Sequence, residues 1–465
     1  MLTLAQLVFV SLSAGALALA PFFPLYGPER RQPIVLTSQA GSPLYLTSFI
    51  RNGQLIEAKK RAQVGPLKGT ATYPSFSGLL TVNETTRSNM FFWFFPAAHN
   101  SSTAPVTLWL QGGPGTSVLF GVFVENGPYR VTVDVDLRQR ATSWHKLSNM
   151  IYIDNPVGTG FSYTKHNEGY ARTEDDVVKN LYEALRQFFT LFHEYSNNDF
   201  YIMGESYAGK FAPALAHAIH KDKQTKIRLT GIVLAGGYSD PVTMLDYAGF
   251  LEKVALVNRR QADAMRKLQN DIKKEIEHKK YGKAAGGALA LAATIRGFVQ
   301  ARSGFMYNFL YDASPEEFKH YVRFVQTDET RRALHVGRIH FNGRSDVVLT
   351  HLKDDLMRSV KPLIAELMEH YKVLIYSGQL DVFVAASLTA AFVDSIQWSG
   401  AKELAKAPRI VWKDQASAFP AGYVRKVKNF TEVFLRQAGH TVGFDQPERA
   451  YDMIDRFFNN KSFDE

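Results

Sequence analysis

A serine between a strand-like run and a helix is the first residue in this sequence with clear chemical potential. The segment GESYAG, residues 204–209, follows an apolar run at 200–203 and precedes a helix-forming stretch at 210–220. A serine on such a turn projects its hydroxyl away from the backbone, and the turn accepts only very small residues two places to either side. Glycine and alanine stand there, which favours Ser206 as a nucleophile; a turn that merely contains serine is the alternative.

Two residues further along the chain could activate this serine. Asp381 follows the apolar run 373–376 and a short turn, so it lies just past a predicted strand, where open α/β sheets place functional groups. His440 follows the strand-like run 431–435 and a turn with a glycine. The order Ser, Asp, His is that of α/β-hydrolases. Singly, such an aspartate usually caps a turn and such a histidine lies at the surface, but an ordered trio after three predicted strands indicates catalysis.

A glycine-rich loop could stabilise the negative charge that a serine attack creates. Residues 111–115, QGGPG, come directly after the strand-like run 106–110. Glycines let backbone N–H groups approach a substrate that a side chain would block. One such donor can lower the barrier by about 3 kcal/mol. An ordinary Gly/Pro turn is the alternative interpretation.

Alternating strand and helix signals predict how these residues are positioned. A helix is expected around residues 175–192, because apolar residues recur there every three or four positions. Such alternation predicts an α/β fold of the α/β-hydrolase type, with a mostly parallel central sheet flanked by helices. The predicted strands are 90–95, 106–110, 150–153, 200–203, 232–234, 373–376 and 433–435.

The pattern changes to helices with few strands between residues 240 and 344. We therefore predict a helical cap insertion at 240–344 within a catalytic core formed by 21–239 and 345–465. Because the insertion separates the strand before Gly236 from the strand before Asp381, we expect it to lie over the catalytic mouth.

Several longer motifs carry a resemblance to a known family. The chain resembles the serine carboxypeptidases from about Pro43 to its C-terminus, and is most similar to the vitellogenic-like branch found in animals. The matching motifs are LWLQGGPG at 108–115, DNPVGTGFSY at 154–163, GESYAGK at 204–210, GH at 439–440 and DQP at 445–447, with FFWFFP at 91–96, VENGPY at 124–129 and KVLIYSGQLD at 372–381 for the branch.

The resemblance implies a role for each candidate residue. Ser206 would be the nucleophile, His440 the general base and then acid, and Asp381 the group that orients the imidazole. The N–H groups of Gly113 and Tyr207 would form the oxyanion hole. The substrate's terminal carboxylate would be bound by Trp109, Gln111, Glu125 and Glu205.

That carboxylate site predicts activity in acid. A carboxyl side chain donates a hydrogen bond to a carboxylate only while it is protonated, and two carboxyl groups in contact raise the pKa of one of them. We therefore expect Glu205 to hold the proton; a residue that fills space or pairs with a cation is the alternative. Two departures from the family pattern could alter the activity: Gln111 replaces the usual Asn, and Gly443 replaces a Pro beside His440.

The remaining features predict passage through the secretory pathway. Residues 1–20 are apolar and small, as in a signal peptide, and the alternative of an uncleaved anchor is weakened by the shortness of the run. The sequence contains no cysteine, which excludes a thiol nucleophile and any disulfide. Four N-glycosylation acceptor sites lie at Asn83, Asn100, Asn429 and Asn460.

The net charge of +10 does not predict a nucleic-acid partner, since the basic residues are scattered and their densest stretch, 259–283, has the pattern of a solvated amphipathic helix.

No metal-ligand spacing and no phosphate loop is present in the sequence, so we expect neither metal nor cofactor. The expected partners are peptide or protein C-termini, without a stable membrane anchor, and the resemblance also implies a homodimer.

The sequence thus predicts an acid-active serine carboxypeptidase, secreted or lysosomal, that releases C-terminal residues through an acyl-enzyme. Two alternatives stay open. One is an acyltransferase or esterase that uses the same three residues. The other is a secreted storage or protective binding protein with weak or no catalysis.

Overall fold

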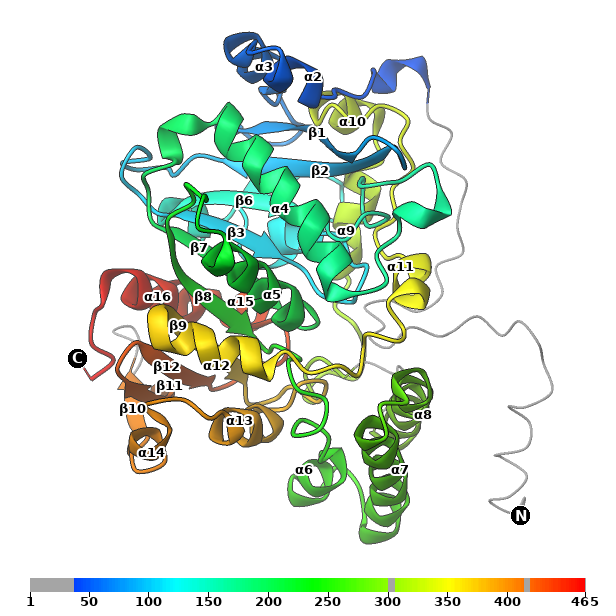
Figure 1. The fold of residues 1–465 in the computed structure, drawn as a ribbon, viewed down its shortest axis with the longest axis vertical. Coiled ribbons are helices and arrows are strands. Elements are labelled where there is room, and N and C mark those ends of the chain that lie inside the picture. Colours follow the sequence, from blue (N-terminus) through cyan, green and yellow to red (C-terminus); the bar gives the residue numbers. More distant parts are fainter. Residues whose placement is uncertain (1–36, 300–305, 414–418, 465) are drawn as a thin grey trace, which may run out of the picture.

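A large twisted sheet forms the centre of the molecule. The computed structural model describes residues 37–299, 306–413 and 419–464, so the predicted signal peptide lies outside the described residues. Within them, ten strands form one sheet in the order β1-β2-β6-β3-β7-β8-β9-β12-β11-β10 (Figure 1). The strands are β1 (Phe76–Asn83), β2 (Ser88–Phe95), β3 (Val106–Leu110), β6 (Asn149–Ile153), β7 (Phe200–Glu205), β8 (Leu229–Ala235), β9 (Lys372–Gly378), β10 (Ile410–Lys413), β11 (Pro420–Val427) and β12 (Phe430–Leu435), with β4 (Tyr129–Val131) and β5 (Leu137–Gln139) as a separate pair.

The middle of the sheet is parallel and its two edges are antiparallel. Strands β6, β3, β7, β8, β9 and β12 pair in parallel, whereas β1 and β2 at one edge and β10 and β11 at the other pair antiparallel. All residues of β3, β6 and β12 are buried, as expected for strands covered on both faces. The predicted α/β-hydrolase fold with a mostly parallel sheet is confirmed.

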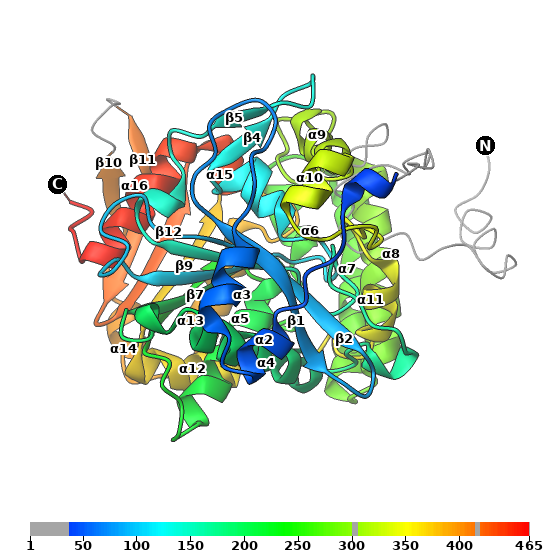
Figure 2. The ribbon, with the colours of Figure 1, turned by 90° about the horizontal axis from the view of Figure 1, so that it is seen from above.

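Helices cover both faces of this sheet. Helices α4, α5 and α12 lie on one face, and α16 lies on the opposite face (Figures 1 and 2). The helices are α2 (Thr47–Arg51), α3 (Leu55–Ala62), α4 (Glu174–Leu191), α5 (Ala208–Lys221), α6 (Tyr247–Lys253), α7 (Arg259–Glu277), α8 (Tyr281–Val299), α9 (Glu317–Phe324), α10 (Asp328–Ala333), α11 (Asp346–His351), α12 (Lys361–His370), α13 (Ala386–Ser395), α14 (Ala401–Leu404), α15 (Val442–Asp445) and α16 (Pro447–Asn459).

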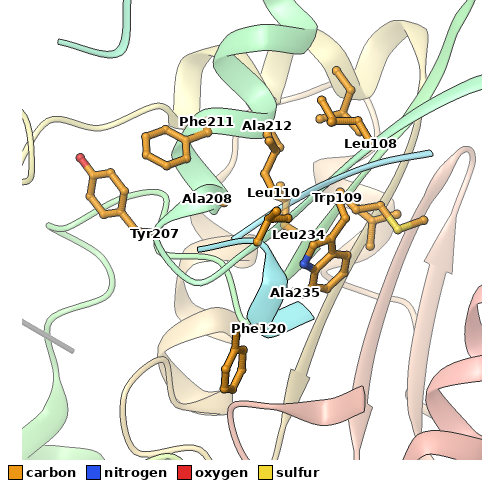
Figure 3. Close-up of a cluster of buried hydrophobic side chains, with 14 of the residues drawn as sticks. Leu108, Trp109, Leu110, Phe120, Tyr207, Ala208, Phe211, Ala212, Leu234 and Ala235 are labelled. Carbon is orange, nitrogen blue, oxygen red and sulfur yellow. The ribbon is translucent and has the colours of Figure 1, made fainter. Parts of the chain in front are cut away.

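The core beneath α5 fixes the position of the turn that carries Ser206. Leu108 and Leu110 of β3 and Leu234 of β8 are fully buried, and Phe211 and Ala212 of α5 lie against this cluster (Figure 3). Burial of large apolar side chains contributes roughly 1.5–3 kcal/mol each, so the start of α5 is held by packing as well as by its own hydrogen bonds.

The described part of residues 240–344 contains the helices α6 to α10 and no strand. Helices α7 and α8 form an antiparallel pair at one side of the molecule (Figure 1). After α8, the chain returns along residues 306–311 to the ends of the central strands, where Phe309 N donates to Leu380 O at 3.1 Å. The division into core and cap stays a prediction. In the described parts of the chain, no helix has the length and apolar character needed to cross a membrane.

Candidate active site

Ser206 stands on a strained turn between β7 and α5. Its φ of 58° lies in the left-handed region, which is uncommon for a residue with a side chain. A Cβ at Gly204 would lie 2.2 Å from Ala208 O, and a Cβ at Gly209 would lie 2.6 Å from Gly237 Cα. The two glycines are therefore required by the close packing of the turn, and the local geometry is that of a nucleophile elbow.

Asp381 and His440 form a buried pair. Asp381 Oδ2 lies 2.7 Å from His440 Nδ1. Asp381 Oδ1 accepts hydrogen bonds from the N–H groups of Phe383 at 2.7 Å and Val384 at 3.0 Å, so both oxygens of the carboxylate are engaged. The turn after β9 thus fixes the carboxylate, and the carboxylate fixes the imidazole.

The Asp381–His440 pair packs beside the turn that bears Ser206. Ser206 N donates to Ala235 O at 3.0 Å, and a Cβ on the next residue, Gly236, would lie 3.5 Å from both Asp381 Oδ2 and His440 Nδ1. His440 Nε2 is buried and accepts or donates no hydrogen bond within the described part of the chain. The structure therefore brings the three residues to the same edge of the sheet but does not form a Ser206–His440 hydrogen bond.

The glycine-rich loop after β3 lies directly against the elbow. A Cβ at Gly112 would lie 2.6 Å from Ser206 Cβ and 2.7 Å from Tyr207 N, so a side chain at this position is excluded. The N–H groups of Gly113 and Tyr207 donate to no other described residue. Two backbone donors are thus available beside Ser206, as an oxyanion hole requires.

The four residues expected to bind a terminal carboxylate form one buried hydrogen-bonded chain. Trp109 Nε1 donates to Gln111 Oε1 at 3.0 Å. Gln111 Nε2 donates to Glu205 Oε1 at 2.7 Å and to Glu125 Oε1 at 3.1 Å. Glu125 is presented by a single π-helical turn, η2 (Gly121–Glu125), a distortion often found at functional sites.

The two glutamates of this chain have raised pKa values. Burial raises the pKa of Glu205 well above its ordinary value, and the charge of Glu125 raises it further. Burial also raises the pKa of Glu125, although hydrogen bonds with Glu205 and Gln111 act in the opposite direction. The pair therefore favours holding a proton, and Glu205 has the greater tendency to hold it.

Several residues that we did not single out from the sequence also contact the site. Tyr307 O accepts the His440 N–H at 2.6 Å, and the ring centroids of these two residues are 4.8 Å apart. Asp445 Oδ2 accepts from Gly439 N at 2.6 Å and from Asn308 Nδ2 at 3.0 Å, so it ties the His440 loop to the returning segment 306–311. No local pattern marked Tyr307, whereas Asp445 belongs to a motif whose role was not assigned.

Asp154, from the DNPVGTGFSY motif, holds the segment that follows the glycine-rich loop. Its carboxylate accepts from Ser117 Oγ at 2.7 Å, Val118 N at 2.9 Å and Phe161 N at 2.8 Å. Burial raises the pKa of Asp154 to about 6. The motif therefore positions the segment that follows the oxyanion loop.

The remaining sequence-predicted sites are the four glycosylation acceptors. Asn100, Asn429 and Asn460 are exposed, and Asn83 is partly exposed. Over the ranges that the structure describes, no cluster of three or more His, Cys, Asp or Glu side chains could hold a metal ion.

Comparison with known proteins places this geometry in a family. The serine carboxypeptidase family model matches residues 66–460. A human protein named "Probable serine carboxypeptidase CPVL" is 44% identical over 437 residues, which cover 91% of each chain. The venom serine carboxypeptidase of Apis mellifera is 41% identical over 98% of each chain, and the vitellogenic carboxypeptidase of Aedes aegypti is 38% identical over 90% of each.

A solved structure shares the fold. The crystal structure of Kex1(delta)p, a prohormone-processing carboxypeptidase from Saccharomyces cerevisiae, superposes with a TM-score of 0.78 at 23% identity, covering 86% of this chain and 96% of that one. Since the family model spans most of the sequence and relatives above 40% identity span at least nine tenths of it, this chain belongs to the serine carboxypeptidase family.

Proposed function

We propose that this protein releases amino acids from the C-termini of peptides by an acyl-enzyme mechanism. The observation that supports it best is the meeting of three features at one edge of the sheet. These are the strained Ser206, the Asp381–His440 pair, and the unused N–H groups of Gly113 and Tyr207.

In the proposed mechanism, Ser206 Oγ attacks the scissile carbonyl carbon while His440 Nε2 takes the hydroxyl proton. The resulting oxyanion accepts hydrogen bonds from Gly113 and Tyr207, and Asp381 stabilises the imidazolium. Collapse breaks the C–N bond, and His440 gives its proton to the leaving amine. Water then attacks the ester, and its proton passes through His440 back to Ser206.

Substrate binding would select a free chain end. The amide of Gln111 and a protonated Glu205 would donate hydrogen bonds to the terminal carboxylate of the peptide, which a blocked end does not offer. Because ionised Glu125 and Glu205 would repel that carboxylate, peptidase activity is expected to be greatest in acid. The raised pKa of Glu205 supports this expectation.

Labelling with a fluorophosphonate tests the nucleophile. The reagent should modify the wild-type protein and not a folded Ser206→Ala variant. A secreted, folded wild-type chain that is not labelled at any pH would overturn the proposal and favour a binding protein.

Blocked substrates separate a carboxypeptidase from an acyltransferase or esterase. A peptide with a free C-terminal carboxylate should be cleaved with a kcat/KM at least tenfold above that of its amide, because the amide lacks the anion that the Gln111 and Glu205 donors would bind. Equal rates on acid and amide would contradict exopeptidase specificity.

We also propose passage through the secretory pathway, to an acidic or extracellular location. The support is the apolar N-terminus, the exposed acceptor residues Asn100, Asn429 and Asn460, and a relative named venom serine carboxypeptidase. Digestion of secreted protein with an endoglycosidase should lower its apparent mass, and an unchanged mass would contradict glycosylation.

A further inference from the structure

A fully buried lysine contacts the side chain of Tyr207, the residue that follows Ser206. Lys210 is in the first turn of α5 and has no exposed surface. Its Nζ donates to Asp355 Oδ2 at 2.8 Å, to Asp355 O at 2.5 Å and to the Tyr207 hydroxyl at 3.2 Å. The same ammonium lies 5.0 Å from the centroid of the Tyr207 ring.

A second acid adjoins this pair. Glu174 Oε1 lies 3.8 Å from Lys210 Nζ. Burial raises the pKa of Glu174 to about 8, Lys210 lowers it, and the nearby Asp355 carboxylate raises it. Arg358 Nε lies 3.7 Å from Asp355 Oδ1, on a side chain that is half exposed. Lys210 therefore lies between two buried acids, Asp355 and Glu174.

Such a cluster needs an explanation other than stability. A buried ion pair is often no more stabilising than apolar side chains of the same volume, because both charges lose their hydration. The pair does, however, fix geometry between distant segments: Lys210 and Asp355 are 145 positions apart in the chain.

Tyr207 is the residue whose side chain these contacts hold in place. Its backbone N–H is one of the two unused donors beside Ser206, and its side chain is fully buried. The ring packs edge-on against Phe211 at 5.2 Å between centroids, and its hydroxyl points away from the core cluster around Leu110 (Figure 3). One end of this residue thus lies beside Ser206, and the hydroxyl at the other end is contacted by Lys210, with Glu174 as a second neighbour.

We propose that Lys210 is a positioning residue, which aligns the Tyr207 N–H with the oxyanion by anchoring the Tyr207 side chain to Asp355. This inference rests on the proposed function, since it assigns a task to a group that matters only if an oxyanion forms. Hydrogen bonds to an oxyanion depend steeply on donor geometry, and a complete loss of one donor costs about 10²- to 10³-fold in kcat.

Two variants test the proposal by removing either partner of the contact between Lys210 and the Tyr207 hydroxyl. Tyr207→Phe removes only the hydroxyl that Lys210 contacts and leaves the Lys210–Asp355 pair and the backbone N–H in place. Lys210→Met removes the anchor itself at similar length. We expect kcat and the rate of fluorophosphonate labelling to fall roughly 3- to 10-fold in the first and 10- to 100-fold in the second, with KM for a peptide changed less than twofold.

The double variant and a matched lysine complete the design. Tyr207→Phe combined with Lys210→Met should be no slower than Lys210→Met alone, because both act through one contact. Lys372, a half-buried lysine at the start of β9 whose Nζ donates to Phe457 O at 2.8 Å, serves as the control. Lys372→Met is expected to lower the melting temperature without changing kcat.

The outcomes separate this inference from the proposed function. Wild-type kcat in Tyr207→Phe, or losses in both variants that appear in KM alone, would overturn the role of Lys210 while labelling of wild-type Ser206 still supported the peptidase. Failure of the wild-type protein to be labelled would overturn both. If Lys210→Met does not fold, Tyr207→Phe alone decides.

Discussion

At the scale of single residues, the most informative group is the pair Glu125 and Glu205. Both carboxyl groups touch the same Gln111 amide in a site that is almost completely buried, so their charges are poorly screened. Burial raises both pKa values, and the charge of Glu125 raises the pKa of Glu205 further. If the proposed function holds, the site accepts an anionic chain end only while it retains a proton.

Replacing Glu205 by Gln should remove that dependence on pH. In the wild type, the KM for a peptide with a free C-terminus should rise as pH increases through the raised pKa of Glu205, because the protonated form is the donor. Glu205→Gln keeps a donor at every pH, so the ratio of KM at pH 8 to KM at pH 5 should fall about tenfold.

Glu366→Gln is the matched control for this measurement, since Glu366 lies at the surface beside Lys221 and its pKa is lowered to about 2. It should leave the pH profile unchanged. A Glu205→Gln profile that coincides with the wild-type profile would show that Glu205 is not the titrating donor.

Asp381→Asn should reduce catalysis without unfolding the site. The asparagine oxygen can still accept from the N–H groups of Phe383 and Val384, but its NH₂ group would face His440 Nδ1 and select the wrong tautomer. We expect kcat to fall on the order of 10⁴-fold. Single-turnover acylation measures the loss, circular dichroism checks the fold, and a kcat within tenfold of wild type would contradict the role.

Among residues, the sequence allowed Ser206, Asp381 and His440 to be selected because each follows a strand at a distinctive turn. Tyr307 and the Lys210–Asp355 contact could not be found in the same way. Their significance arises only when segments far apart in the chain are brought together, and no local periodicity records that contact.

At the scale of elements, the short helix α15 follows His440 and packs against η2, which carries Glu125. The sequence predicts that Gly443, in place of proline beside His440, could alter the activity. The structure places Gly443 within α15, where a Cβ would lie 3.1 Å from Glu125 O and 3.2 Å from Glu125 Cβ. The absence of a side chain thus lets α15 approach η2 closely.

Gly443→Ala tests this close approach. The added methyl group should displace Glu125 by a few tenths of an ångström and raise the peptide KM about 3- to 10-fold, with a smaller change in kcat. Gly286→Ala in α8 is the control, because a Cβ there would meet nothing within 4 Å. If KM is unchanged in Gly443→Ala, α15 does not set the position of Glu125.

The elements that could be predicted are those with strong apolar runs. The predicted bounds of β3 match the structure, and the predicted strands at β6, β7, β8, β9 and β12 are short by one to a few residues at their ends. The edge strands β1, β10 and β11 were not predicted. Their sequences mix glycine, proline or charged residues with apolar ones, because part of each strand faces solvent. The π-helical turn η2 has no local sequence signal at all.

At the scale of the whole molecule, buried acids set the response to pH. Burial raises the pKa of Glu174 to about 8 and that of Asp154 to about 6, and it also raises the pKa of Asp445. Together with Glu125 and Glu205, these groups bind protons in the folded state that the unfolded chain would release above about pH 4.5.

The raised acids should therefore favour the folded protein as pH falls from 8 to 5, against a smaller opposite contribution from His145, whose pKa burial lowers to about 4. For an acid whose pKa is raised on folding, the native state binds more protons than the unfolded state between the two pKa values, so the free energy of unfolding decreases as pH rises through that range. The melting temperature at a fixed scan rate should be several degrees higher at pH 5 than at pH 8. Glu174→Gln cannot ionise at this position, so it should flatten the dependence of melting temperature on pH most strongly between pH 6 and 8. Glu366→Gln is the control and should not change that dependence, because the lowered pKa of Glu366 affects stability only below about pH 4.5. A slope between pH 6 and 8 that Glu174→Gln leaves unchanged would mean that Glu174 is already ionised in the native state over that range, and would contradict the raised pKa of this buried acid.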